Sequence, residues 1–155
     1  MTPTRVAIAG ATGYVGGRMV PRLLELGYSV RCLVRSPRKL SGRSWANHPN
    51  VQIRQVDLTD EATLVDDLRG CSAAFYLVHS MMSASADYAR QDLLLAETFS
   101  RASRAARLER IVYLGGLGET GADLSEHLSS RREVEHALGS AGVPVTVLRA
   151  AMIIG

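Results

Sequence analysis

Residues 5–17 of the chain read RVAIAGATGYVGG, and this stretch decides the fold. The apolar run 6–9 is typical of a strand that is buried on both faces. Apolar side chains recur at helical spacing from Val15 to Leu26. Between the run and the helix stand three evenly spaced glycines: Gly10, Gly13 and Gly16. The order of strand, glycine turn and helix is the context that a dinucleotide fingerprint requires.

Each glycine has a mechanical role in such a fingerprint. One makes the tight turn, one lets backbone N–H groups approach a pyrophosphate, and one lets the helix close on the strand. The free N–H groups and the positive end of the helix dipole then hold the phosphates. The alternative is a tight strand–helix turn that needs only small residues. We predict nucleotide contacts at Gly10, Thr12, Gly13, Tyr14, Val15 and Gly16.

The composition sets the outer limits. A chain of 155 residues with 46% hydrophobic residues should form one domain with a sizeable core. No apolar run is long enough to cross a bilayer, and the N-terminus lacks the apolar region of a signal peptide. We therefore expect a cytoplasmic protein.

Charge and ligand-type residues argue against several classes of site. The formal net charge is +3, and all 18 basic residues except Lys39 are arginines scattered among acids, which predicts solvated helix faces and no nucleic-acid binding. No Walker-type phosphate loop is present. The four histidines show no ligand spacing, so no metal site is expected. Cys32 and Cys71 lie in apolar, strand-like segments and are predicted to be buried thiols.

Strands and helices alternate along the rest of the chain. Gly27 is a plausible end for the first helix, Ser36 is a predicted N-cap for a short helix at 38–40, and Thr59 or Asp60 caps the next. Longer helices are expected at 86–108 and 125–140. The predicted strands are 6–9, 28–34, 51–56, 73–78, 111–114 and 143–148. Apolar strands alternating with helices indicate an α/β fold, a doubly wound parallel (Rossmann) sheet in the order 3-2-1-4-5-6 with helices on both faces.

The end of the second strand bears on the choice of nucleotide. NAD sites place an acid about 20 positions beyond the fingerprint. Arg35 stands there instead, and no carboxylate occurs anywhere in 27–50. A guanidinium suits a 2′-phosphate, so NADP(H) is favoured, with NAD(H) possible; the alternative is an arginine solvated at a strand end. The missing acid also weighs against S-adenosylmethionine and FAD.

Two further strand ends contribute candidate residues. Asp57, followed by Leu58, could accept a hydrogen bond from the adenine amino group, or could simply cap a turn or helix. Leu77, Val78 and His79 close the fourth strand beside the expected nicotinamide ribose. His79 could also be only a strand-end histidine with an ordinary partner.

Five stretches together carry a resemblance to a known family: GATGYVG at 10–16, VDL at 56–58, YLVHSM at 76–81, YLGGLG at 113–118 and VPVTVLRA at 143–150. The chain resembles atypical short-chain dehydrogenases/reductases of the NAD(P)H-binding, NmrA-like kind, and within them bacterial proteins that carry Leu-Val-His-Ser-Met. The nucleotide-binding accessory subunit of respiratory complex I is a more distant relative. Such relatives continue into a C-terminal part that shapes the substrate cleft. The resemblance therefore implies that 1–155 is the nucleotide-binding, N-terminal portion of a longer protein.

The resemblance breaks at the catalytic motif. Catalytic members of the family use a Tyr-x-x-x-Lys on the helix after the fifth strand and a serine at the end of that strand. Aligned on Glu135, this chain has His127 and Arg131 at those two positions, and Gly115 and Gly116 replace the serine. His127 could move a proton near neutral pH and Arg131 could bind the nicotinamide ribose. Alternatively, both face solvent or the nucleotide.

These observations are compatible with three alternative functions. The first is an NADP(H)-binding domain of an atypical reductase with a non-standard active site and an unknown small-molecule substrate. The second is a non-catalytic redox sensor that binds the dinucleotide and acts on a protein partner. The third is a structural or assembly subunit that the bound dinucleotide stabilises by mass action.

Overall fold

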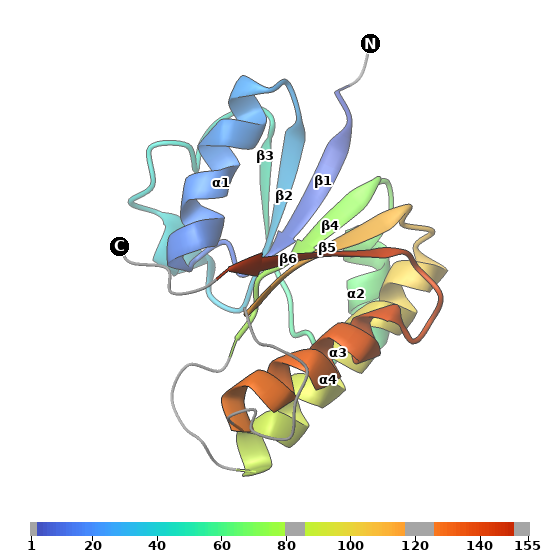
Figure 1. Ribbon diagram of the computed structural model, residues 1–155. Coiled ribbons are helices and arrows are strands. Elements are labelled where there is room, and N and C mark those ends of the chain that lie inside the picture. The colour runs from blue at the N-terminus through green and yellow to red at the C-terminus, as the bar shows by residue number, and fades with distance from the viewer. Residues whose placement is uncertain (1–2, 80–85, 117–125, 151–155) are drawn as a thin grey trace.

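The computed structural model describes residues 3–79, 86–116 and 126–150, with side chains described throughout except at 86 and 126–130. Its strands are β1 (Arg5–Ala9), β2 (Ser29–Val34), β3 (Val51–Gln55), β4 (Ala73–Tyr76), β5 (Arg110–Gly116) and β6 (Val145–Ala150). Its helices are α1 (Tyr14–Glu25), α2 (Glu61–Leu68), α3 (Ala86–Ala105) and α4 (Glu126–Gly139), with a 3-10 helix, η1 (Pro37–Leu40). The strands form one parallel sheet in the order β3-β2-β1-β4-β5-β6, which confirms the predicted topology (Figure 1).

Side chains of β1 point alternately into two separate cores. Val6 and Ile8 pack with Val20 of α1 and with Trp45, whereas Ala7 and Ala9 face the core that α2, α3 and α4 cover. In Figure 1, α1 lies on one side of the sheet and the other three helices on the opposite side. Burial on both faces is the reason that this strand reads as a continuous apolar run.

The end of α1 confirms the predicted role of Gly27. Gly27 has φ +83°, and the N–H groups of Gly27 and Tyr28 donate to the carbonyls of Leu24 (2.9 Å) and Leu23 (3.0 Å). These two bonds form a Schellman motif, in which glycine adopts the left-handed conformation without a Cβ penalty. Leu26, the last residue of the apolar spacing, is the C-cap of the helix, and its side chain is 73% exposed.

Two other local predictions need correction. Ser36 is the N-cap residue as predicted, but its side chain makes no cap hydrogen bond, and the short helix that follows is η1, which starts at Pro37 and not at position 38. The fourth strand ends at Tyr76, so Leu77 and Val78 belong to the connection after β4. Asp60 is the N-cap of α2, since its carboxylate accepts from the Thr63 N–H at 3.2 Å.

A buried arginine lies in β2. Arg31 is buried within the strand, and its Nη1 donates to the carbonyls of Asp67 (2.6 Å) and Arg69 (2.9 Å). Its Nε donates to Gln52 on β3 at 3.1 Å. The carbonyls at the end of a helix lack intrahelical partners, so Arg31 satisfies them and joins α2 to the sheet.

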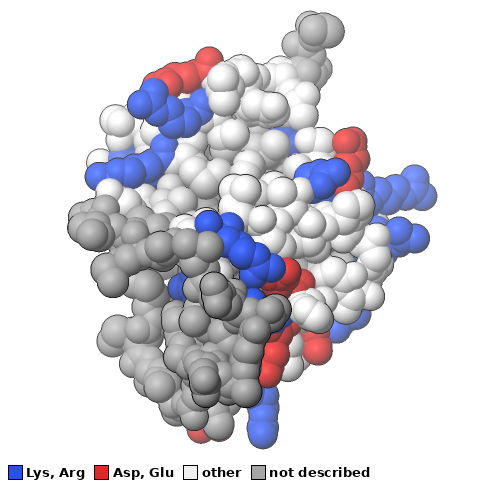
Figure 2. All heavy atoms as spheres, viewed as in Figure 1, with Lys and Arg blue, Asp and Glu red and all other residues white. Residues whose placement is uncertain are grey.

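Both cysteines are free and buried, as predicted. Burial raises the pKa of Cys32 to about 12, so this thiol stays protonated at neutral pH. On the surface, acidic and basic side chains are interspersed (Figure 2), and Arg22 pairs with Glu25 at 2.7 Å. None of the helices in the described part of the chain has the length and apolarity that a membrane crossing requires.

Candidate functional site

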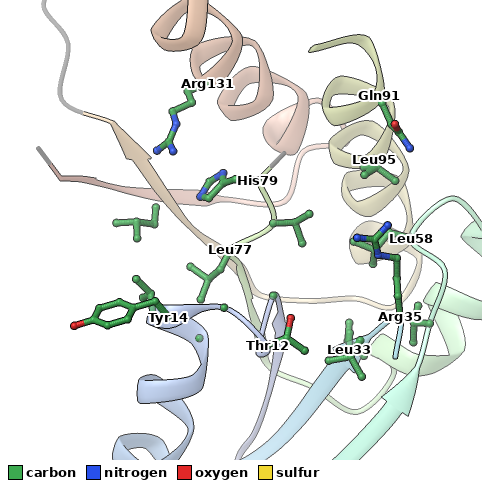
Figure 3. A pocket seen from close by; sticks show the side chains of 18 of the residues that line it. Thr12, Tyr14, Leu33, Arg35, Leu58, Leu77, His79, Gln91, Leu95 and Arg131 are labelled. Carbon is green, nitrogen blue, oxygen red and sulfur yellow. The ribbon is translucent and has the colours of Figure 1, made fainter. Parts of the chain in front are cut away.

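The carboxyl ends of the strands open into a cavity of about 800 Å³ (Figure 3). It lies where the strand order reverses between β1 and β4, the usual ligand position in doubly wound sheets. The residues predicted to bind a cofactor all line it: Gly10, Thr12, Gly13, Tyr14, Val15, Gly16, Arg35, Asp57, Leu58, Leu77, Val78 and His79. The fold therefore brings them together, and their contact with a ligand stays a prediction.

Two of the three glycines are required by the fold itself. Gly10 has φ +100°, and a Cβ there would lie 2.7 Å from the Leu77 carbonyl oxygen. A Cβ at Gly16 would collide with the Gly10 carbonyl oxygen and lie 2.9 Å from the Cα of Ala11. The turn itself is closed by the Gly13 N–H, which donates to the Gly10 carbonyl at 3.1 Å. Gly10 and Gly16 thus allow β1, its turn and α1 to pack closely.

Gly13 is different, because the fold leaves room for a side chain there. Its φ is −77°, which any residue can adopt, and a Cβ would meet only the Gly10 carbonyl oxygen at 3.4 Å, an ordinary contact. The position is the N-cap of α1 and faces the cavity. A glycine here leaves space above the backbone N–H groups, which is what close approach of a pyrophosphate needs.

The first turn of α1 presents its N–H groups without a competing acceptor. Gly13 provides no side-chain cap, and the turn contains no acidic residue. The N–H groups at a helix start have no intrahelical partner and carry the positive end of the dipole. The backbone N–H groups at the start of α1 are therefore suited to holding a diphosphate. Beside them, the Tyr14 ring lies 3.9 Å from the guanidinium of Arg18, a cation–π contact.

Arg35 and Asp57 lie at the β2–β3 end of the cavity. Arg35 directly follows β2, is exposed, and extends toward Leu58 in Figure 3. Asp57 Oδ1 accepts from the Thr59 N–H (2.9 Å) and hydroxyl (2.7 Å), which establishes the turn role that was one of its two predicted readings. These bonds, first from the backbone and then from the hydroxyl, lower the pKa of Asp57, and the Arg35 charge lowers it further. The carboxylate remains exposed on the cavity wall.

The opposite end of the cavity lies between β4, β5 and α4. His79 packs edge-on against Tyr113, with the ring centroids 6.0 Å apart. Tyr113 is buried on β5, and its hydroxyl donates to the Arg131 carbonyl at 3.3 Å. Burial raises the pKa of Tyr113 to about 12, although the nearby Arg131 charge lowers it. Gly115, at the position of the family's serine, also lines the cavity and offers no hydroxyl.

Of the two residues aligned with the family's catalytic pair, the structure describes the side chain of Arg131 but not that of His127. Arg131 lines the cavity, and Figure 3 shows its side chain extending from α4 into the region where the His79 ring lies. Its Nε is buried without a hydrogen-bond partner. Position 127 belongs to the first turn of α4, but the His127 side chain lies outside the described residues. In the described part of the chain, no cluster of three or more His, Cys, Asp or Glu residues could hold a metal ion.

Helix α3 supplies cavity residues that the sequence analysis missed. Tyr88, Gln91 and Leu95 all line the cavity. Tyr88 is 41% exposed. The available signal was topological: α3 follows β4, so the start of this helix lies at the same sheet edge as the glycine turn.

A family model described as NAD(P)H-binding matches residues 10–154 of the chain. Among curated proteins, dihydroflavonol 4-reductase of Gerbera hybrida is 34% identical over 91 residues, which is 56% of this chain and 25% of that protein. A 4-hydroxy-2-methyl-3-oxo-4-farnesyl-3,4-dihydroquinoline-1-oxide ketoreductase of Stigmatella aurantiaca is 30% identical over 112 residues, 71% of this chain and 33% of that protein.

Solved structures of two reductases have a similar fold. The NADPH-dependent quinone oxidoreductase QOR2 of Escherichia coli, complexed with NADPH, has a TM-score of 0.76 and 25% identity, over 93% of this chain and 48% of that one. Citrobacter triphenylmethane reductase complexed with NADP(H) has a TM-score of 0.78 and 21% identity, over 96% and 50%. The chain thus spans between a quarter and a half of these relatives. Since the family model covers nearly all of it, the chain belongs to the NAD(P)H-binding family, as an atypical, NmrA-like short-chain dehydrogenase/reductase domain.

Proposed function

We propose that this domain binds NADP(H) in the cavity at the carboxyl edge of the sheet, and that it is the cofactor-binding domain of a reductase. The observation that carries the proposal is Gly13. Its backbone conformation and surroundings would accept a side chain, yet the residue is glycine and lies above the bare N–H groups at the start of α1. A diphosphate occupying that space accounts for the glycine.

The preference for NADP(H) over NAD(H) rests on Arg35. This guanidinium stands where NAD sites have an acid, and residues 27–50 contain no carboxylate that could accept hydrogen bonds from the ribose hydroxyls. In the described residues Arg35 forms no ion pair within 4.0 Å, so its planar fork is available to a 2′-phosphate. Two structural neighbours, QOR2 and triphenylmethane reductase, were solved with NADPH or NADP(H). Asp57 would then lie near the adenine.

At the other end, the bound dinucleotide would supply a hydride from its nicotinamide ring. His79 would lie beside the nicotinamide ribose, and Leu77 and Val78 would keep water from that side. Reductase activity is supported by the ketoreductase and dihydroflavonol reductase among the relatives. His127 and Arg131 are the candidate catalytic residues, in place of the family's tyrosine and lysine.

A non-catalytic role is the second candidate, and a specific observation favours it. The chain lacks the Tyr-x-x-x-Lys motif, and Gly115 stands at the position of the serine. A redox sensor or an assembly subunit would need the glycine turn and Arg35 to bind the dinucleotide. It would not need the tyrosine, lysine and serine side chains that catalytic family members use. In such a role, the bound dinucleotide stabilises the folded state by mass action.

One experiment separates the two functions. NADPH and NADH binding is measured by calorimetry, and NADPH oxidation is then followed with a panel of carbonyl and quinone substrates. Binding together with substrate-dependent oxidation supports the reductase. Tight binding with no oxidation above background would exclude it and favour the sensor. A cytoplasmic location, and the assignment of 1–155 as the N-terminal portion of a longer protein, stay predictions.

A further inference from the structure

The guanidinium of Arg43, in the connection between η1 and β3, lies against the backbone of α1. A Cβ added at Gly17 would lie 3.2 Å from Arg43 Nη2 and 3.3 Å from its Cζ. Gly17 is one turn beyond the N-cap, since its N–H donates to the Gly13 carbonyl at 2.9 Å. The contact depends on glycine, because a side chain at position 17 would push the guanidinium away.

No other contact of Gly17 requires glycine. Its next neighbour is the carbonyl oxygen of Ala11, which would lie 3.5 Å from a Cβ, an ordinary contact. The residue lies inside α1, where glycine is less stable than alanine. Space for the Arg43 guanidinium therefore accounts for this glycine.

The backbone around Arg43 is held in place, whereas its charged group is available. The Arg43 N–H donates to the Leu40 carbonyl, and the Arg43 carbonyl accepts from the Ala46 N–H, both at 3.0 Å. Leu40 and Trp45 are buried in the core that Val20 of α1 shares, and Figure 1 shows this segment running beside α1. The Arg43 side chain is exposed, and it forms no ion pair within 4.0 Å among the residues that the structure describes.

Acids are scarce in this part of the chain. Glu25 is the only acid in residues 1–56, and it pairs with Arg22 at 2.7 Å. The connection between β2 and β3 also carries Arg35, whose guanidinium forms no ion pair in the described part of the chain. A cation beside the first turns of a helix is disfavoured by the helix dipole. Positive charge is thus gathered here without a neutralising acid, and a bound anion would relieve the repulsion.

We propose that Arg43 is a second ligand of the 2′-phosphate of NADP(H), so that Arg35 at the end of β2 and Arg43 beside α1 hold this phosphate between them. The inference rests on the proposed function and deepens it by adding a residue that determines cofactor specificity. Arg43 does not line the cavity, but it lies about one helical turn, roughly 5.4 Å, from the N-cap Gly13, within reach of a rotamer change. Two guanidinium groups suit a phosphate dianion, and the glycine turn is left to the diphosphate.

The test is calorimetric titration of NADPH and NADH into the wild type and Arg43→Gln. The variant loses charge-assisted hydrogen bonds to a group that only NADPH carries. We expect its NADPH affinity to fall roughly tenfold or more and its NADH affinity to change by less than about threefold.

Gly17→Ala tests the same contact without changing any charge. The new methyl group displaces the flexible end of Arg43, so NADPH should bind about threefold or more weakly, and NADH as before. The same substitution should have no further effect in Arg43→Gln, and this non-additivity identifies Arg43 as the group through which it acts. The melting temperature should not fall, because alanine favours a helix more than glycine does. Gly17→Ala also keeps the test valid if Arg43→Gln does not fold.

Arg107→Gln is the matched control. It removes the same charge from an exposed residue that precedes β5, at the amino edge of the sheet and outside the cavity lining. This variant should bind both dinucleotides as the wild type does.

Three results would overturn the inference while the proposed function stands. They are unchanged NADPH affinity in Arg43→Gln, an equal loss in Arg107→Gln, and equal losses of NADPH and NADH in Arg43→Gln. The last would assign Arg43 to a part that both dinucleotides share. Absence of NADPH binding by the wild type would instead contradict the proposed function, and this inference with it.

Discussion

The two ends of the cavity are built in different ways. The end formed by β1, β2 and the start of α1 presents mainly backbone groups to the cavity, and the residues that line it lie close together in the sequence, from Gly10 to Arg35. The end formed by β4, β5 and α4 depends on side chains from separate elements, such as His79 and Arg131. The first end matches what the NAD(P)H-binding family requires, and the second departs from it. Cofactor binding and catalysis therefore rest on different evidence in this domain.

The largest effect is expected from Gly13→Val. The isopropyl group would fill the space above the first-turn N–H groups of α1, so we expect NADPH and NADH binding to weaken at least about 100-fold, through loss of charge-assisted hydrogen bonds. The fold should persist, with a cost of about 1 kcal/mol at the N-cap, because a Cβ there meets only an ordinary contact. Calorimetry and thermal unfolding measure the two effects.

Two other glycines provide the controls for this change. Gly42 lies in an exposed loop where a Cβ would meet nothing within 4 Å, so Gly42→Val should alter neither binding nor stability. Gly16→Val should instead unfold the domain, because its Cβ collides with the Gly10 carbonyl. If Gly13→Val bound NADPH normally, the phosphate site would not be at the β1–α1 turn.

A more selective effect, confined to NADPH, is expected at Arg35. Arg35→Glu replaces the guanidinium with a carboxylate, which repels a 2′-phosphate but suits free ribose hydroxyls. We expect NADPH affinity to fall roughly 100-fold and NADH affinity to change by less than about threefold. Arg38→Glu makes the same charge change three positions later, at a residue that does not line the cavity, and should have a smaller effect. Equal losses for both dinucleotides would show that Arg35 does not contact the 2′-phosphate.

Features that depend on local sequence patterns were predictable, whereas contacts between distant elements were not. The strand order and the glycine turn follow from local periodicity and spacing, so 3-2-1-4-5-6 was predictable from one sequence. The buried Arg31 was not, because its partners, the carbonyls of Asp67 and Arg69, are brought to it only by the packing of α2.

The cavity wall formed by α3 illustrates the same limit. Periodicity assigns Tyr88 to the apolar face of its helix, but Tyr88 lines the cavity and its side chain is 41% exposed. Helical periodicity identifies a face and does not say what that face meets. Contacts made by single side chains across elements, such as His79 with Tyr113, depend on packing that spacing does not encode.

Tyr113→Phe tests the support of the β4–β5 end. The change removes the hydroxyl that donates to the Arg131 carbonyl and leaves the ring, so we expect the free energy of unfolding to fall by about 1 kcal/mol. NADPH affinity should change little, because the Tyr113 ring that supports His79 is kept and the glycine turn proposed to hold the phosphates lies at the other end. Burial raises the pKa of Tyr113 to about 12, so the difference between variant and wild type should be constant from pH 6 to pH 9. A loss of NADPH binding would show that the two ends are coupled.

The smallest effect is expected at Asp57, within the β2–β3 end. The Thr59 N–H and hydroxyl lower the pKa of this carboxyl in the folded state. A depressed pKa contributes stability above the unfolded-state value, about 3.9, and this contribution is lost as the pH falls through the folded-state pKa. Asp57→Asn lacks the titration, so the stability difference from wild type should be present at pH 7 and shrink toward pH 3, as measured by urea unfolding.

Thr59→Val removes the hydroxyl donor and completes a double-mutant cycle with Asp57→Asn. Because the Thr59 hydroxyl donates to the ionised carboxylate at 2.7 Å, the coupling between the two changes should be present at pH 7 and diminish in acid. NADPH affinity of Asp57→Asn then separates the two roles of this residue. A loss much larger than the stability change requires contact with the bound dinucleotide, whereas an unchanged affinity leaves Asp57 with its turn alone.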